Sequence, residues 1–292
     1  MTILPRVTAV VLTWNAERHV VACVQSLRRS TAVALDVVVV DNASADGTLA
    51  QLRASGVPVT IVETGANLGY AAGNNVGIRH ALAAGAEFVL IVNDDTEIDP
   101  EALGHLVEAL RADPGAAAAA PTILHEAPPR RIWWAGGDFR IARALATHRG
   151  YGVPVAEDVG RASELVDSLC GCGLLVRREA LERLGGFRED FFMYGEDVEW
   201  SLRARRAAWR LLHVPAARML HKVPFPEAAP TPEKIRLRDR NRRRLVRTHY
   251  GWRDRLRFVV WFYPSRALHL VRYLLRADLP RVRAIWAGAI EP

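Results

Sequence analysis

Acidic and amide side chains gather at four places in this 292-residue chain, each after an apolar segment. They are Asp41 to Ser44, the stretch 67–77, Asn93 to Asp95, and Glu196-Asp197. Adjacent carboxylates repel each other unless a cation neutralises them, and hard oxygen ligands suit Mg²⁺ or Mn²⁺ held together with substrate phosphates. A carboxylate that faces a hydroxyl group is suited to act as a general base. These residue types therefore offer metal-assisted chemistry on a phosphate-bearing substrate.

Each cluster also has a purely structural explanation. Asn93-Asp94-Asp95 would be stabilised at a helix N-terminus, and Asp41 to Ser44 is typical of a turn before a helix. The Gly- and Asn-rich stretch 67–77 either packs closely at a strand-to-helix turn or presents backbone N–H groups to a phosphate. Glu196-Asp197 either caps a helix or supplies a general base. His221 is either a core or surface histidine or a third metal ligand.

Hydrophobic periodicity predicts the elements that position these clusters. The first 122 residues alternate β-rich apolar runs with segments of helical period. Such alternation implies a mostly parallel sheet with helices on both faces. Ligands of these sheets bind at the carboxyl ends of the strands, where the clusters fall. The expected strands are 8–13, 35–40, 57–62, 87–92 and 116–123, and the expected helices are 18–29, 46–53, 70–84 and 99–112.

The second half of the chain has a different pattern. Residues 124–165 lack clear periodicity and are expected to form loops and short strands over the sheet edge. A proline-rich linker over 224–232 divides a domain of residues 1–230 from a basic helical segment of residues 231–292. Further expected strands are 174–176, 211–214 and 218–221, and expected helices are 178–184, 196–208 and 234–250, followed by an apolar segment 257–276 that Pro264 breaks.

The charge of the chain is unevenly distributed. Residues 231–292 hold 16 basic and 5 acidic side chains, a net charge of +11, whereas residues 1–230 carry a net charge of −4. Arginines interleaved with apolar and aromatic residues in the segment 234–276 are typical of a helix that lies on an anionic membrane surface. The alternative is packing on the core or across a homodimer interface.

Several classes of protein are excluded or disfavoured. A nucleic-acid partner is not expected, because acidic strand ends repel phosphate and no binding motif is present. Three cysteines rule out a disulfide framework, and no apolar run reaches the ~18 residues of a membrane span. The expected compartment is the cytoplasm. Thr13-Trp14-Asn15 stands where a dinucleotide enzyme or a sugar-nucleotide pyrophosphorylase would have a Gly-rich loop.

Five stretches taken together resemble a known family. They are 10–15, 38–48, 67–77, 90–96 and 185–197, in this order along the chain. The sequence resembles the inverting glycosyltransferases of family 2, which have the GT-A fold, over residues 5–222. Within that family it is similar to the branch that includes bacterial rhamnosyltransferases and galactofuranosyltransferases.

The resemblance implies roles for particular residues. Asp41 would read the nucleotide base, Thr13, Asn15 and Asn67 would line the nucleoside, and Gly69, Asn74 and Asp94 would complete the nucleotide-sugar site. Asp95 would be the main ligand of a Mg²⁺ or Mn²⁺ ion at the family's D-x-D position, whose first residue is Asn93 here, with His221 as a further ligand. Asp197 would be the catalytic base, with Glu196, Trp200 and Arg203 on the acceptor side.

The resemblance also implies an activity. A nucleoside-diphosphate sugar, dTDP-rhamnose or a UDP-sugar, would donate its sugar to a hydroxyl of a glycan or of a polyprenyl-diphosphate-linked saccharide. The setting would be bacterial surface polysaccharide synthesis, at the inner face of the membrane if the basic segment binds lipid. The alternative is a catalytically weak member that acts as a sugar-nucleotide-binding scaffold.

Overall fold

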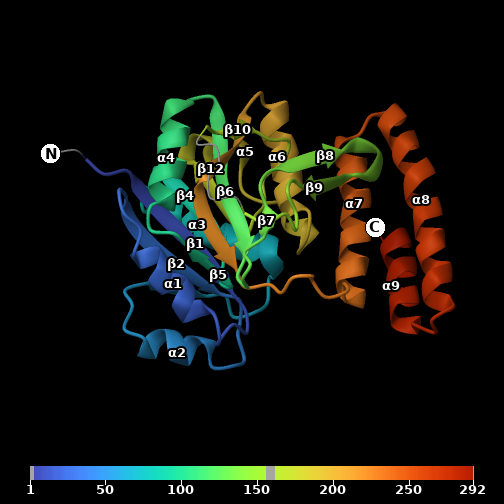
Figure 1. Ribbon diagram of the computed structural model, residues 1–292, viewed down its shortest axis with the longest axis horizontal. Coiled ribbons are helices and arrows are strands. Elements are labelled where there is room, and N and C mark those ends of the chain that lie inside the picture. Colours follow the sequence, from blue (N-terminus) through green and yellow to red (C-terminus); the bar gives the residue numbers. More distant parts are fainter. Residues whose placement is uncertain (1–2, 156–161, 292) are drawn as a thin grey trace.

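The computed structural model describes residues 3–155 and 162–291, and its centre is one large sheet (Figure 1). The strand order in this ten-stranded sheet of the described residues is β10-β12-β6-β11-β4-β1-β2-β3, with β5 added to β12 and β7 added to β6. The strands are β1 Arg6–Thr13, β2 Ala34–Asp41, β3 Thr60–Glu63, β4 Phe88–Asn93, β5 Thr96–Ile98, β6 Ala116–His125, β7 Ile132–Trp134, β10 Glu164–Leu165, β11 Gly173–Arg177 and β12 Arg210–His221. The helices are α1 Val20–Arg28, α2 Thr48–Ala54, α3 Gly69–Ala83, α4 Ala102–Ala112, α5 Arg178–Leu184, α6 Glu196–Arg206, α7 Pro232–His249, α8 Trp252–Leu274 and α9 Leu279–Ile290.

Parallel pairing brings the predicted strand ends together. β1 lies between β2 and β4 and is parallel to both, in a register that pairs Thr13 with Asp41 and Leu12 with Asn93. β11 is antiparallel to its neighbours β4 and β6, and β6 and β12 are again parallel. The expectation of a mostly parallel α/β sheet flanked by helices is therefore confirmed for the strands that carry the site, whereas β11 in the middle and the short strands β5, β7 and β10 pair antiparallel.

Small residues bring α3 close to the sheet. A Cβ atom added at Gly77 would lie 2.2 Å from Cγ1 of Val10 and 3.0 Å from Cγ2 of Val40. The glycines of the stretch 67–77 therefore allow close helix-to-sheet packing, as the structural explanation of this stretch predicts. They also fix the start of α3 beside the ends of β1 and β2.

Two expectations about the second half are wrong. The strands expected at 211–214 and 218–221 are one strand, β12, whose pairing with β6 shifts register between Val214 and Arg218. α8 continues through Pro264. A proline removes one helical hydrogen bond to the carbonyl of the residue four positions earlier, and here that residue, Val260, is 66% exposed, so water can solvate the carbonyl. α9 lies within the segment 231–292 that was expected to be helical, although its bounds were not predicted.

The middle of the chain forms a hairpin as well as an edge strand. β8 (Gly137–Arg140) and β9 (Leu145–His148) pair with each other, separated by the 3₁₀ turn η1 (Ile141–Arg143). A second 3₁₀ turn, η2, spans Glu189–Phe191. The expectation of short strands over 124–165 is confirmed for the residues described, and residues 156–161 lie outside them.

The last three helices form a group beside the α/β body, and the β8–β9 hairpin reaches toward them (Figure 1). Tyr250 donates its hydroxyl hydrogen to the carbonyl of Ile141 in η1 at 2.8 Å. Arg266 of α8 forms an ion pair with the buried Asp239 of α7 at 3.0 Å. Within the described residues, no helix is both long enough and apolar enough to span a membrane.

Candidate active site

A cavity of about 610 Å³ opens at the carboxyl ends of β1 and β4. Its lining comes from these strand ends, the start of α3, the β7–β9 region, the segments 168–172 and 193–198, and the first turns of α7. The residues of the acidic clusters that line it are Asn93, Asp94, Asp95, Glu196 and Asp197. Two clusters that lie far apart in the sequence therefore share one cavity.

The Asn93-Asp94-Asp95 cluster carries unpaired oxygens. Burial, followed by the neighbouring charge of Asp95, raises the pKa of Asp94 to about 7. Burial acts in the same direction on Asp95, but its 3.3 Å contact with Nε2 of His221 outweighs it and lowers the pKa of Asp95. One oxygen of Asp95 and the side-chain oxygen of Asn93 are buried without a hydrogen-bond partner among the described residues.

These oxygens fit a hard divalent cation in part. Mg²⁺ is usually bound by one or two carboxylates together with substrate phosphates, and the two unpaired oxygens beside Asp95 match that chemistry. The described residues contain no group of three His, Cys, Asp or Glu side chains able to hold a metal ion unaided. A cation here would therefore take the rest of its ligands from a bound substrate.

The loops after β1 and β2 are tied to each other at the rim of the cavity. Asn15 donates its backbone N–H to Oγ of Ser44 at 2.9 Å and accepts from the backbone N–H of Ala45 at 2.8 Å. The Asp41 carboxylate accepts from the backbone N–H of Ser44 at 3.1 Å, as expected of a turn. Neither Asp41 nor Asn15 lines the cavity, whereas Thr13 does.

The start of α3 completes this rim. Asn42 donates to Oδ1 of Asn67 at 3.0 Å and accepts from the backbone N–H of Leu68 at 3.0 Å. Asn42, Asn67 and Gly69 line the cavity. Asn74 does not, because its buried side chain donates to the carbonyl of Tyr70 within α3.

The carboxylate of Asp197 is held by backbone N–H groups. One of its oxygens accepts from Gly171 at 3.0 Å and the other from Val198 at 2.7 Å. Burial raises the pKa of Asp197 despite these bonds. Burial and the adjacent Asp197 raise the pKa of Glu196 well above its usual value, and one Glu196 oxygen lacks a partner among the described residues.

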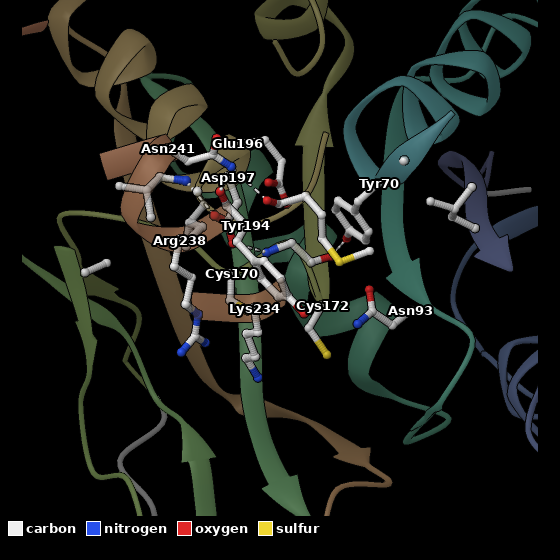
Figure 2. A pocket seen from close by; sticks show the side chains of 18 of the residues that line it. Tyr70, Asn93, Cys170, Cys172, Tyr194, Glu196, Asp197, Lys234, Arg238 and Asn241 are labelled. Carbon is white, nitrogen blue, oxygen red and sulfur yellow. Dashed lines mark hydrogen bonds between the residues drawn. The ribbon is translucent and has the colours of Figure 1, made fainter. Parts of the chain in front are cut away.

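A loop with positive φ angles directly precedes Glu196 and Asp197. Phe192, Tyr194 and Gly195, which precede Glu196, have positive φ angles of 61°, 72° and 92°. The amide nitrogen of Asn241 in α7 donates to the carbonyls of Phe191, Met193 and Tyr194 at 2.9, 2.8 and 2.7 Å. The C-terminal helices thus fix the backbone that presents Asp197, and Figure 2 shows Asn241 beside this loop.

Trp200 and Arg203, which the resemblance places on the acceptor side, do not line the cavity. Trp200 is buried and donates to the carbonyl of Gly185 at 3.0 Å. Arg203 forms an i,i+4 ion pair with the buried Glu199 at 2.8 Å.

Several residues of the cavity were not found from the sequence. They are Tyr70, Trp133, His148, Tyr194, Lys234, Arg238 and Asn241. The hydroxyl of Tyr70 donates to the carbonyl of Gly171 at 2.8 Å, which joins α3 to the loop that holds Asp197. Lys234 and Arg238 lie four residues apart on α7, a spacing visible in the sequence, but nothing there showed which face of the helix meets the cavity.

Comparisons with known proteins agree with this arrangement. The family model for "Glycosyl transferase family 2" matches residues 8–185. The chain is 30% identical over 231 residues to the N-acetylglucosaminyl-diphospho-decaprenol L-rhamnosyltransferase of Mycobacterium tuberculosis, covering 73% of this chain and 74% of that protein. It is 27% identical over 221 residues to the dTDP-rhamnosyl transferase RfbF of Shigella flexneri, covering 74% and 68%.

Solved structures show the same fold at low sequence identity. GalNAc-T7 with UDP, GalNAc and Mn²⁺ superposes with a TM-score of 0.66 at 16% identity, covering 90% of this chain and 51% of that one. The mannosyltransferase PcManGT from Pyrobaculum calidifontis, in complex with GDP-Man and Mn²⁺, gives a TM-score of 0.60 at 20% identity, covering 99% and 87%. From its sequence match and its GT-A fold, the chain belongs to glycosyltransferase family 2.

Proposed function

We propose that this protein is an inverting glycosyltransferase that moves a sugar from a nucleoside-diphosphate sugar to a hydroxyl of a glycan or lipid-linked saccharide. The observation that carries the proposal is the shared cavity. Asp95 at the end of β4 and Asp197 at the start of α6 both line it, although about 100 residues separate them in the sequence. One carboxylate suits a cation that would hold the donor's diphosphate, and the other suits the acceptor's hydroxyl.

In this mechanism, different residues would bind the donor, hold the cation and act as the base. Thr13, Asn67 and Gly69 would hold the nucleotide sugar, with Asp41, Asn15 and Asn74 supporting the loops around it. A divalent cation bound at Asp95, with Asn93 and His221 beside it, would neutralise charge on the leaving diphosphate. Asp197 would remove the acceptor's proton as that oxygen attacks the far face of the sugar C1. A single displacement of this kind inverts the anomeric centre.

The donor and acceptor are proposed from relatives. Two similar proteins carry rhamnosyl transfer in their names, one with a dTDP-sugar donor and one with a diphospho-decaprenol acceptor. We propose dTDP-rhamnose first and a UDP-sugar second, a polyprenyl-diphosphate-linked acceptor, and a place in bacterial surface polysaccharide assembly. Residues 1–230 would carry the transfer reaction and residues 231–292 would serve the acceptor side.

The experiment is a panel of nucleotide sugars tested with Mn²⁺, Mg²⁺ or a chelator, read out as donor hydrolysis and as melting temperature. A ligand at 100 times its Kd adds about 2.7 kcal/mol of stability. A metal-dependent shift with one donor supports the proposal and names the donor. If no nucleotide sugar shifts the melting temperature or is hydrolysed, the proposed catalysis is contradicted. The scaffold alternative is contradicted too, because it also requires a bound nucleotide sugar. A shift without hydrolysis or transfer favours the scaffold.

A surface on the C-terminal helices supports a peripheral membrane location at the cytoplasmic face. Apolar side chains of α8 and α9 are exposed, among them Trp252 at 72%, Leu268 at 73% and Trp286 at 63%. Arg253, Arg257 and Arg272 lie among them and are exposed. An apolar stripe next to arginines matches the two components of an anionic lipid surface. The alternative occupant, a second copy of the chain, would appear as a dimer in solution.

A further inference from the structure

Two cations of α7 face the cavity on the side away from the β4 carboxylates. Lys234 and Arg238 both line it, and both lie over the ring of Tyr194, with Lys234 Nζ 5.6 Å and Arg238 Cζ 5.3 Å from the ring centroid. Figure 2 shows Arg238 at the left and Asn93 at the right, with Tyr194 between them. The pair is therefore separate from the acidic edge where the donor's diphosphate is proposed to bind.

This pair lacks matching negative charge. The nearest carboxylate to Lys234 is Glu227 at 4.0 Å. Glu227 is itself engaged by Nε1 of Trp133 at 2.7 Å. Within residues 3–155 and 162–291, Arg238 makes no ion pair of 4.0 Å or less. Like charges four residues apart on a helix repel each other, and burial and Arg238 together lower the pKa of Lys234.

The position of the pair relates it to the reacting hydroxyl. His148 on the cavity wall feels the charges of both Asp197 and Arg238, although burial is the main influence on its lowered pKa. Lys234 and Arg238 also lie over Tyr194, three residues before Asp197 in the loop that presents this carboxylate, so the two cations and Asp197 line the same part of the cavity. A saccharide whose hydroxyl meets Asp197 would direct its anomeric phosphate group toward α7.

We propose that Lys234 and Arg238 form the binding subsite for the diphosphate group of the acceptor. This inference rests on the proposed function and adds to it the residues that would recognise a prenyl-diphosphate-linked acceptor. Arginine binds phosphate oxygens in a bidentate manner and lysine adds a point charge. The donor also contains a diphosphate, so the test must separate the two sources.

The test measures binding to the full-length protein by calorimetry. Geranyl diphosphate and inorganic pyrophosphate are titrated in the presence of a chelator, and dTDP and UDP are titrated with Mn²⁺. Lys234→Gln and Arg238→Gln should each weaken the binding of geranyl diphosphate about tenfold, because charge-assisted hydrogen bonds to phosphate are strong. Binding of the nucleoside diphosphates should change less than twofold. Arg247→Gln is the matched control, because Arg247 is exposed on the same helix and does not line the cavity.

Three results would overturn the inference. They are no binding of geranyl diphosphate to the native protein, an equal loss caused by Arg247→Gln, and a loss confined to the nucleoside diphosphates, which would assign the pair to the donor. Lys234→Arg should retain binding, and melting temperatures show that each variant is folded. Hydrolysis of the nucleotide sugar, measured separately, reports on the proposed function, so failure of one is distinguishable from failure of the other.

Discussion

The side-chain amide of Asn241 donates a 2.7 Å hydrogen bond to the carbonyl of Tyr194, two residues before Glu196. The same nitrogen also bonds the carbonyls of Phe191 and Met193. A helix of the C-terminal group therefore holds the backbone conformation of the loop that carries the proposed base. Because a buried carbonyl without a partner is destabilising, this loop depends on side chains of a distant segment, and Arg240 of α7 also donates to the carbonyl of Phe191 at 2.9 Å.

Asn241→Ala should lower both stability and turnover. We expect a loss of about 1–3 kcal/mol of unfolding free energy, the usual penalty for unpaired buried polar groups, together with a reduced kcat. Donor binding at the β1 and β4 strand ends should be retained. Chemical denaturation and steady-state kinetics measure the two effects. Arg247→Ala on the exposed side of the same helix is the control, and an equal effect of that variant would contradict a specific role for Asn241.

Asp197→Asn should abolish most of the activity while the protein keeps its donor. Removing a general base lowers kcat by about 10²–10⁴-fold. The amide can still accept from Gly171, so the fold is expected to persist. Transfer assays at saturating donor, with donor affinity measured by calorimetry, check both statements. Asp254→Asn on the exposed side of α8 is the control. Near-native turnover of Asp197→Asn would remove Asp197 from the mechanism.

Glu196→Gln should stabilise the protein at alkaline pH. The pKa of Glu196 is raised well above 4.5 by burial, so the folded state binds a proton that the unfolded state releases. Unfolding free energy is then highest below about pH 4.5 and falls as the pH rises toward the folded-state pKa. The neutral amide removes this dependence, and we expect a gain of about 1–3 kcal/mol at pH 8 that shrinks at pH 5. Glu179→Gln, on exposed α5 surface, should show no such trend in melting temperature.

Gly77→Ala should destabilise the fold without touching the cavity. The added methyl would lie 2.2 Å from Cγ1 of Val10, so α3 must move away from β1. Overpacking of this kind costs about 1–3 kcal/mol. Urea denaturation measures the change, and Gly56→Ala is no control because its positive φ adds strain. Gly251→Ala is suitable, since nothing lies within 4 Å of its added Cβ; an equal loss there would argue against the packing explanation.

Replacing apolar residues of α8 should release the protein from anionic vesicles. The triple variant Trp252→Ser, Val260→Ser, Leu268→Ser removes side chains that are 72%, 66% and 73% exposed, so the fold should be unaffected. Cosedimentation with phosphatidylglycerol vesicles at low salt should fall to the level seen with neutral vesicles. Leu165→Ser, also exposed at 62%, should bind like the native protein. Absence of binding by the native protein, with a dimer in solution, would favour the second-copy alternative.

The strand ends of the site were predictable because burial leaves a clear signature in sequence. β1, β2 and β4 are continuous apolar runs, and their parallel register requires the residues that follow them to meet. Thr13, Asp94 and Asp95 reach the cavity for this reason. Asp41 and Asn15 were predicted to contact a nucleoside; in the structure Asn15 joins the two loops at the rim and the Asp41 carboxylate stabilises the turn after β2.

The remaining site residues depend on information that local sequence lacks. The orientation of α6 places Trp200 and Arg203 against the carbonyls of residues 184–186, although both follow Asp197 closely in sequence. The basic residues of α7 have nearly uniform spacing, so the sequence did not distinguish Lys234 and Arg238 from arginines that pack elsewhere. The sequence predicts that Pro264 breaks its segment. Whether a proline is tolerated inside a helix depends on the exposure of the carbonyl four residues earlier, here that of Val260, and this exposure is set by the tertiary structure.

The three hydrogen bonds of Asn241 also limit which segments can be exchanged between members of this family. The family match ends at residue 185, before the proposed base at 197, and the side chain that holds the base's loop belongs to the last quarter of the chain. A chimera could exchange residues 231–292 for the corresponding helices of a relative. It would then lose the side chain that holds the loop before Asp197, unless the relative's helix carried an asparagine at the position of Asn241.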